Sequence, residues 1–292
     1  MITFIVCSIS PERVKALEYN IKHTIGNVPY VMSVFDNRQM KYGIAKVYNL
    51  CAAKAQTEYL CFLHEDVAFL SRDWGTSILH KLKEKESGVI GFTGSPVKLR
   101  SISSVHPSYK LMDNHYVQRF NGKRRLLMDT SSCDIDFSPC VTIDGMCMFV
   151  RREVWQECPF DEQLLPGFHG YDLDFSLQVA ERYQNYVCYT ALIEHFSVGS
   201  FSVEWVATTV RLHRMKWEKR LPLYTDAFKR EEVEQLEEDG FYRFIKKALR
   251  TNYPFRQTYQ LVRQYWQMTS FRKHSFTLLL KLIGNCFLHI KV

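Results

Sequence analysis

The sequence lacks the glycine-rich motifs through which many nucleotide-binding proteins hold phosphates. None of its 13 glycines belongs to a P-loop or a G-x-G-x-x-G sequence. Nine cysteines are present, but no two form a C-x-x-C pair, which argues against a zinc site or a dithiol redox motif. An odd number of scattered cysteines in apolar runs is typical of reduced, buried thiols, so we expect a cytoplasmic protein.

Long apolar runs are also missing. The first residues, "ITFIVCSIS", have neither the positive flank nor the cleavage site of a signal peptide, and no segment reaches transmembrane length. The chain has 292 residues, of which 46% are hydrophobic and 14% aromatic, and it can therefore bury a large core. We expect a globular protein that faces the cytosol.

Acidic residues are absent from the last part of the chain. There is no Asp or Glu from Phe241 to Val292, although the formal net charge of the whole chain is only +7, so the rest is slightly acidic. We place a boundary at the charged stretch "KREEVEQLEEDG" and expect a domain over residues 1–228 and a basic appendage over residues 229–292. The basic residues after Phe241 are Arg243, Lys246, Lys247, Arg250, Arg256, Arg263, Arg272, Lys273, Lys281 and Lys291.

Helical spacing in this region predicts amphipathic helices. Before the boundary, one predicted helix has an apolar face made of Val206, Val210, His213 and Trp217. After the boundary, a second helix has a face made of Phe241, Phe244, Ile245, Ala248 and Leu249. A third helix, after Pro254, has a face made of Phe255, Tyr259, Val262 and Trp266. Two interpretations remain open. Residues 241–292 could lie on an anionic membrane surface, or the helices could pack on protein and leave a solvated basic face.

The first 92 residues alternate between strand-like and helix-like segments. "ITFIVCS", "YVMSVF", "YLCFL" and "GVIGF" are short and rich in β-branched or aromatic residues, and helical patterns lie between them. This order predicts an α/β fold, Rossmann-like, with a mostly parallel sheet flanked by helices. In such sheets ligands bind beyond the carboxyl ends of the strands.

Two polar clusters follow strands of this predicted sheet. Asp36 comes after the second strand, and His64, Glu65 and Asp66 come after the third. Because the chain has no glycine-rich cradle, a divalent cation, Mg²⁺ or Mn²⁺, is the expected partner of a diphosphate, and acidic side chains would bind it. The alternative is that Asp36 and Asp66 only form turns.

The second half of the domain adds further polar positions. Asp144 precedes Gly145 in "TIDGMCMFVRREVW", Asp172 and Asp174 open a helix in "GYDLDFSLQV", and His195 ends the segment "ALIEH". Residues two apart do not share a helix face, so only one of the two aspartates is expected to point into a given site. An Asp at a helix start also commonly caps the helix. Between the halves, "RFNGKR" predicts a tight hairpin turn at Asn121 and Gly122.

Taken in order, six segments resemble the inverting nucleotide-sugar glycosyltransferases of the GT-A fold, and most closely the bacterial glycosyltransferase family 2-like group. The segments are "VFDN", "YGIAKVYNLCAAKAQTEYLCFLHEDV", "IGFTGSP", "IDGMCMFVRREVW", "GYDLDFSLQV" and "EHFSVGS". The resemblance covers residues from Met1 to about Ser202. It implies a GT-A domain and transfer of a sugar from a nucleoside-diphosphate sugar to an acceptor hydroxyl.

The resemblance also implies roles for single residues. Asp172 matches the catalytic base, Asp66 matches a metal ligand, and His195 matches a residue that completes the metal shell. His64 stands where an Asp is usual, so it is a further candidate ligand, and this departure bears on the choice between Mn²⁺ and Mg²⁺. The nucleotide sugar or the acceptor would be bound by Asp36, at the base, and by Asp144 and Asp174. Glu65 would bind the ribose or support the metal ion.

The resulting hypothesis is a metal-assisted, inverting sugar transferase of polysaccharide or glycoconjugate synthesis, with a sugar or a lipid-linked sugar as acceptor. Peripheral binding to the inner face of the plasma membrane would suit a lipid-linked acceptor. One alternative is a catalytically silent nucleotide-sugar-binding protein of the same fold, because of His64. Another is a nucleic-acid-binding protein that uses the basic tail, which the segregation of charge disfavours, so no nucleic acid is expected as a partner.

Overall fold

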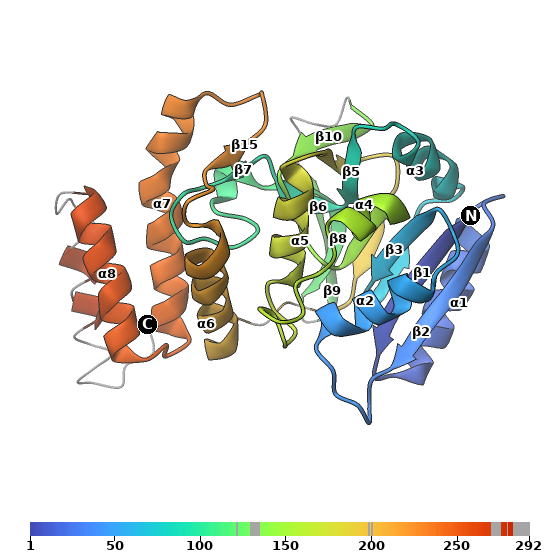
Figure 1. Cartoon of the computed structure of the whole chain (residues 1–292), viewed down its shortest axis with the longest axis horizontal. Coiled ribbons are helices and arrows are strands. Elements are labelled where there is room, and N and C mark those ends of the chain that lie inside the picture. Colours follow the sequence, from blue (N-terminus) through green and yellow to red (C-terminus); the bar gives the residue numbers. More distant parts are fainter. Residues whose placement is uncertain are drawn as a thin grey trace. The chain divides into compact units, whose positions relative to one another are not determined.

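The computed structural model describes residues 1–120, 122–128, 135–197, 199, 201–269, 276–278 and 280–282. The chain forms two compact units. The first contains Met1–Pro96 and Met112–Gly199, and the second contains Val97–Leu111 and Ser200–Val292 (Figure 1). The second unit therefore combines the predicted basic appendage with the helix before it and with a segment taken from the middle of the chain.

A seven-stranded sheet forms the centre of the first unit. Its order is β10-β13-β5-β12-β3-β1-β2. The strands are β1 (Ile2–Ser8), β2 (Tyr30–Asp36), β3 (Tyr59–Leu63), β5 (Ser87–Gly91), β10 (Phe137–Cys140), β12 (Cys147–Arg151) and β13 (Gln184–Cys188). Every residue of β3, β5 and β12 is buried, as expected for strands that are covered on both faces.

Helices cover both faces of this sheet. Alternation along β3 sends Cys61 and Leu63 into one apolar cluster and Leu60 and Phe62 into another. The first cluster includes side chains from α1 (Pro11–Thr24) and α3 (Trp74–Leu82). The second includes side chains from α2 (Ile44–Lys54), α4 (Arg152–Glu157) and α5 (Tyr171–Ala180). The predicted α/β sheet flanked by helices is thus confirmed.

The sheet is mixed rather than purely parallel. β1 pairs in parallel with β2 and β3, but β12 lies antiparallel between β3 and β5. The reason is the turn at Asp144-Gly145, from which β12 begins beside the end of β3, with Cys147 opposite Leu63. This reversal brings the start of β12 to the same edge as the carboxyl ends of β1, β2 and β3.

A second sheet carries the remaining site strands. Its order is β11-β6-β8-β14-β4, with β9 paired to β8. The strands are β4 (Val67–Phe69), β6 (Thr93–Ser95), β8 (Asp113–Phe120), β9 (Lys123–Met128), β11 (Thr142–Ile143) and β14 (Ile193–His195). The predicted hairpin is confirmed, because β8 and β9 pair up to Phe120 and Lys123 and Gly122 has a positive φ of 77°. Asn121 lies outside the described residues.

The second unit is mainly helical. Its helices are α6 (Val203–Leu212), α7 (Arg230–Arg250) and α8 (Phe255–Thr269), with a π-helical turn at His213–Trp217, a short 3-10 helix at Tyr109–Leu111, and a two-stranded sheet of β7 (Val97–Lys98) and β15 (Leu223–Tyr224). The face predicted before the boundary and the first face after it are both buried. Side chains from α6, α7 and α8 share one apolar cluster.

The face predicted for α8 is partly wrong. Val262 is buried, but Phe255 and Tyr259 are 52% and 43% exposed, whereas Leu261 and Tyr265 are buried. The helix buries the face that contains Tyr265. The Tyr265 hydroxyl donates to Glu238 Oε1 on α7 at 2.9 Å, so this polar group has a hydrogen-bond partner at a core position.

The structure also bears on the cysteines and on the membrane. Seven cysteines are free, and Cys133 and Cys286 lie outside the described residues. Among the residues that the structure describes, no helix has the length and apolar character needed to span a bilayer. Arg272, Lys273 and Lys291 of the predicted basic appendage lie outside the described residues.

Candidate active site

Predicted site residues gather at one edge of the central sheet. Ser8 at the end of β1 pairs with Asp36 at the end of β2, and Val6 pairs with Leu63 at the end of β3. His64, Glu65 and Asp66 follow directly after β3. The carboxyl ends of these strands therefore form the edge at which the predicted polar clusters meet.

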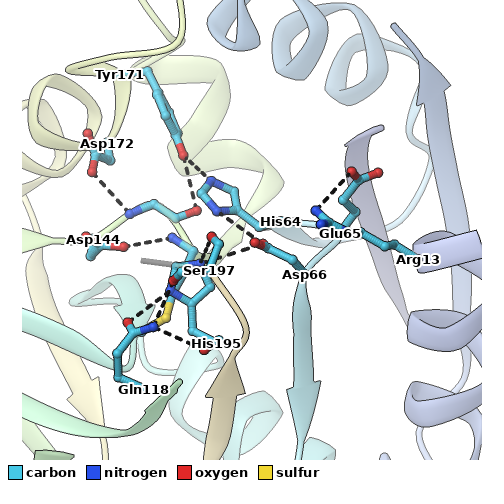
Figure 2. Close-up of polar contacts among 12 residues, drawn as sticks. Arg13, His64, Glu65, Asp66, Gln118, Asp144, Tyr171, Asp172, His195 and Ser197 are labelled. Atoms are coloured by element: carbon cyan, nitrogen blue, oxygen red, sulfur yellow. Dashed lines mark hydrogen bonds and ion pairs between the residues drawn. The ribbon is translucent and has the colours of Figure 1, made fainter. Parts of the chain in front are cut away.

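His64, Asp66 and His195 form a possible metal site, in which one ligand atom from each residue lies within 4.8 Å of the others. His64 Nδ1 is 3.9 Å and His195 Nε2 is 3.6 Å from Asp66 Oδ1 (Figure 2). The Asp66 and His195 side chains are 10% and 11% exposed, and that of His64 is 32% exposed. Pairing of β14 with β4, in which His195 lies opposite Val67, brings together residues distant in sequence.

Hydrogen bonds orient both imidazole rings. The Tyr171 hydroxyl donates to Gly145 O at 3.3 Å and lies 2.7 Å from His64 Nε2. With the hydroxyl proton on Gly145 O, the Nε2–H tautomer of His64 donates to Tyr171 and leaves the Nδ1 lone pair for an ion. His195 Nδ1 lies 3.4 Å from Gln118 Oε1, which leaves Nε2 toward Asp66. Partners of this kind fix the tautomer that can bind a metal ion.

The electrostatics also suit a cation. Burial works to raise the pKa of Asp66, but hydrogen bonds from His195 and Ser197 outweigh it and hold this pKa well below the usual range. Burial lowers the pKa of His64, which favours the neutral imidazole. Two imidazole nitrogens and one carboxylate fit a divalent first-row ion such as Mn²⁺ better than Mg²⁺, which prefers oxygen ligands. The residues therefore fit the expected metal ion.

Asp144 lies in the turn before β12, and Asp172 contacts this turn from the start of α5. Asp172 Oδ2 accepts a hydrogen bond from Gly145 N at 3.2 Å, and Asp144 Oδ1 accepts one from Met146 N at 3.1 Å. Burial, together with the negative charge of Asp144, raises the pKa of Asp172 to about 7. A carboxylate with a pKa near neutrality is suited to general-base catalysis.

Only glycine fits at position 145, because Tyr171 packs directly against it. A Cβ at Gly145 would lie 2.1 Å from the hydroxyl oxygen of Tyr171. Any other residue would therefore displace Tyr171, which bridges this turn and His64. The absence of a side chain at Gly145 thus lets Tyr171 contact both His64 and the turn that carries Asp144.

The start of α5 distinguishes its two aspartates. Gly170, with φ of 78°, occupies the N-cap position, and Asp172 is the second residue of the helix. Asp172 directs its carboxylate to Gly145. Asp174 is fully buried and accepts a hydrogen bond from Gln178 Nε2 of the same helix at 2.9 Å.

Glu65 stabilises the loop between β1 and α1 by accepting hydrogen bonds from it. Its Oε2 accepts hydrogen bonds from Ser8 Oγ at 2.6 Å and from the amides of Ile9 and Ser10 at 3.1 Å each, and Arg13 lies 3.8 Å from Oε1. One carboxylate oxygen thus satisfies three donors of the loop.

Asp36 is solvent-exposed and pairs with Arg38, whose Nη2 is 2.6 Å from Oδ2. Hydrogen bonds from the Arg38 side chain and amide lower the pKa of Asp36 to about 2. Asp36 therefore remains ionised, at the same sheet edge as Ser8.

Tyr171 and Gln118 are residues that the sequence did not single out. Tyr171 directly precedes Asp172, so its position beside a candidate base was a usable signal. Gln118 lies on β8 opposite His195 on β14, and this parallel pairing has no counterpart in the sequence pattern.

Comparisons with known proteins place these observations in context. No curated protein matches the chain. Among solved structures, TarS 1–349 of S. aureus in complex with UDP is similar, with a TM-score of 0.52 and 12% identity over 97% of this chain and 88% of that one. A mannosyltransferase of Pyrobaculum calidifontis, in complex with GDP-Man and Mn²⁺, has a TM-score of 0.49 and 11% identity over 98% and 87%. At 12% identity, the likeness to TarS concerns the fold alone.

The sequence itself identifies the family. The family described as "Glycosyltransferase like family" matches residues 3–220. This match spans most of the chain and includes His64, Asp66 and His195, the Asp144-Gly145 turn and the start of α5. The expected GT-A fold and family are thus confirmed, and the chain belongs to this glycosyltransferase-like family, of the family 2 type.

Proposed function

We propose that the protein is an inverting glycosyltransferase that moves a sugar from a nucleoside-diphosphate sugar to an acceptor hydroxyl. The observation that carries this proposal is Asp172, whose carboxyl group has its pKa raised to about 7. Asp172 lies at the start of α5 next to Tyr171, which contacts both Gly145 and His64. The TarS structure of similar fold holds UDP, which supports a nucleotide-sugar donor.

In the proposed reaction, Asp172 accepts the proton of the acceptor hydroxyl. The hydroxyl oxygen forms a bond to the anomeric carbon from the face opposite the diphosphate, the bond from that carbon to the diphosphate oxygen breaks, and the configuration inverts. Asp66, His195 and His64 would hold Mn²⁺, which when bound neutralises charge on the leaving diphosphate. Asp66 supplies the negative charge of this site, and an ion that binds there would take the place of the proton through which His195 Nε2 interacts with Asp66.

The remaining residues have proposed binding roles. Asp36, ionised and exposed, would accept hydrogen bonds from the nucleoside base. Glu65 would act at the ribose mainly by ordering the β1–α1 loop, since one of its oxygens is occupied by three loop donors. Asp144 would orient the donor sugar or the acceptor, and Asp174 would support the first turn of α5 behind Asp172.

We further propose a role in polysaccharide or glycoconjugate synthesis, with a sugar or a lipid-linked sugar as acceptor. Side chains of α6, α7 and α8 form one apolar cluster within their own unit, while Phe255 and Tyr259 of α8 stay exposed. We propose that binding to an anionic membrane relies on exposed basic residues such as Arg256 and Arg263. Flotation with vesicles of anionic lipid tests this, and equal flotation of the wild type and a variant with Arg256→Glu and Arg263→Glu would contradict it.

A panel of nucleotide sugars with Mn²⁺ tests the transferase proposal. Release of nucleoside diphosphate should occur with one donor and should require the metal ion, and NMR of the product should show an inverted anomeric configuration. Asp172→Asn should slow release about 100- to 10,000-fold. Binding without release in the wild type would instead favour a catalytically silent nucleotide-sugar-binding protein.

A further inference from the structure

The second unit contains a pocket that uses none of the residues proposed for catalysis. It has a volume of about 530 Å³, which is within the usual range for small-molecule sites. The wall includes the loop at Arg100–Ile102, the π-helical turn, α7 and α8. These segments all belong to the second unit.

His213 lines this pocket and carries a buried polar atom without a hydrogen-bond partner among the described residues. The side chain is 7% exposed, and its Nδ1 is buried with no hydrogen-bond partner among the described residues. Burial, followed by the nearby charges of Lys98 and Arg214, lowers the pKa of His213 to about 3, so the ring is neutral. A buried nitrogen without a partner is unfavourable, and a hydroxyl group, which can both donate and accept, would satisfy it.

The backbone at His213 is unusual as well. The amide of Glu218 donates to His213 O at 2.8 Å, which closes a wider turn than in an α-helix. Such π-helical turns are rare and occur often at functional sites. Here the wide turn follows directly on α6 and contains two residues of the pocket wall, His213 and Arg214.

The pocket wall carries charges of both signs. It contains two arginines, Arg100 and Arg214, and three glutamates, of which Glu234 is neutralised by Arg230 outside the wall, whose Nε lies 2.9 Å from its Oε1. Glu237 is further held by the amides of Arg100 and Ser101, at 2.6 and 2.8 Å. A wall with both signs of charge gives no net attraction to either an anion or a cation, and favours a neutral polar ligand.

The rest of the wall combines amides and apolar surface. Gln264 and Gln267 offer both donors and acceptors, whereas Ile102, Phe241 and Met268 offer apolar contact. A sugar ring has the matching chemistry, with hydroxyl groups around its edge and C–H groups on its faces. We propose that this pocket binds a neutral saccharide unit, with His213 and the two glutamines at its hydroxyl groups. This site goes beyond the proposed transferase function and does not depend on it.

Direct binding tests the proposal. Methyl glycosides of glucose, galactose, mannose, N-acetylglucosamine and N-acetylgalactosamine would be titrated into the full-length protein and followed by saturation-transfer NMR. We expect at least one glycoside to bind, and Gln267→Trp, which fills the pocket from an exposed position of α8, to raise its Kd at least tenfold. Arg263→Trp places the same side chain at an exposed position of α8 outside the wall, and should leave Kd within about twofold.

Two further arms separate this site from the active site. Asp172→Asn should keep glycoside binding, since the pocket uses none of the catalytic residues. In protein with ¹⁵N-labelled histidines, the glycoside should shift one imidazole resonance that is missing in His213→Phe. Absence of binding by every glycoside, equal binding by Gln267→Trp, or binding of inorganic phosphate in place of glycosides would each overturn the proposal.

Discussion

Replacing Asp172 by Asn should raise stability and remove turnover at the same time. Asn has nearly the same shape and can still accept the hydrogen bond from Gly145 N, but it carries no charge. Raising the pKa of this carboxyl from 3.8 to about 7 places up to about 4 kcal/mol of unfavourable free energy on its ionised form in the folded protein. The side chain keeps some solvent access, so we expect Asp172→Asn to gain at least about 1 kcal/mol at pH 8.

The pH dependence gives the sign of this effect. Above pH 7 the Asp172 carboxylate is ionised in both the folded and the unfolded protein, so the folded protein carries the full unfavourable free energy of the buried charge. Between about pH 7 and 3.8 only the folded protein keeps the proton, so the cost declines as the pH falls, and below 3.8 both states are protonated. The gain from Asp172→Asn should therefore be largest at pH 8 and vanish near pH 4.

Urea denaturation at both pH values and initial rates of nucleoside diphosphate release measure the two effects. Asp226→Asn removes the same charge from an exposed position of the second unit and should change neither stability nor rate. A loss of stability in Asp172→Asn, as expected if the negative charge only interacts favourably with the amino end of α5, together with near-normal turnover, would refute the reasoning.

Three other predictions concern the surroundings of the site. Tyr171→Phe removes the partner of His64 Nε2 and should weaken Mn²⁺ binding about 10- to 100-fold in a titration followed by electron paramagnetic resonance, and unchanged affinity would contradict this. Glu65→Ala leaves three loop donors unpaired and should cost about 1–3 kcal/mol in urea denaturation, whereas a neutral effect would argue against a fastening role. Because the base must be ionised, the rate should rise with pH through about 7, and Asp144→Asn should move this rise to lower pH by removing a neighbouring charge. A pH profile unaffected by Asp144→Asn would contradict that coupling.

The sequence was sufficient to place His64, Asp66 and Asp36 together. The reason is that β1, β2 and β3 run in parallel, so residues that follow them meet at one edge. It was not sufficient to predict that β12 runs antiparallel, because strand direction is set by long-range pairing rather than by local pattern. The contacts of Tyr171 and Gln118 could not be derived either, since they depend on the pairing of β14 and on the absence of a side chain at Gly145.

In α8 the apolar pattern offered more than one face. Phe255 and Tyr259 share a helical stripe, yet their rings stack on each other at the surface with a centroid distance of 6.3 Å. Packing on α7 instead selects Leu261 and Tyr265. Periodicity thus predicted a helix here but did not determine which face is buried.

The most direct test of the central claim is thermal stabilisation by nucleotides. Purified protein would be heated with each nucleoside diphosphate and nucleotide sugar, in Mn²⁺, in Mg²⁺ and in chelator, and the series would be repeated with Asp66→Asn. We predict that one base stabilises the wild type, more strongly with Mn²⁺ than with Mg²⁺, by about 2.7 kcal/mol at 100 times its Kd. Chelator or Asp66→Asn should abolish this gain. Stabilisation that is equal in chelator, or equal in Asp66→Asn, would contradict a metal-assisted nucleotide site at His64, Asp66 and His195.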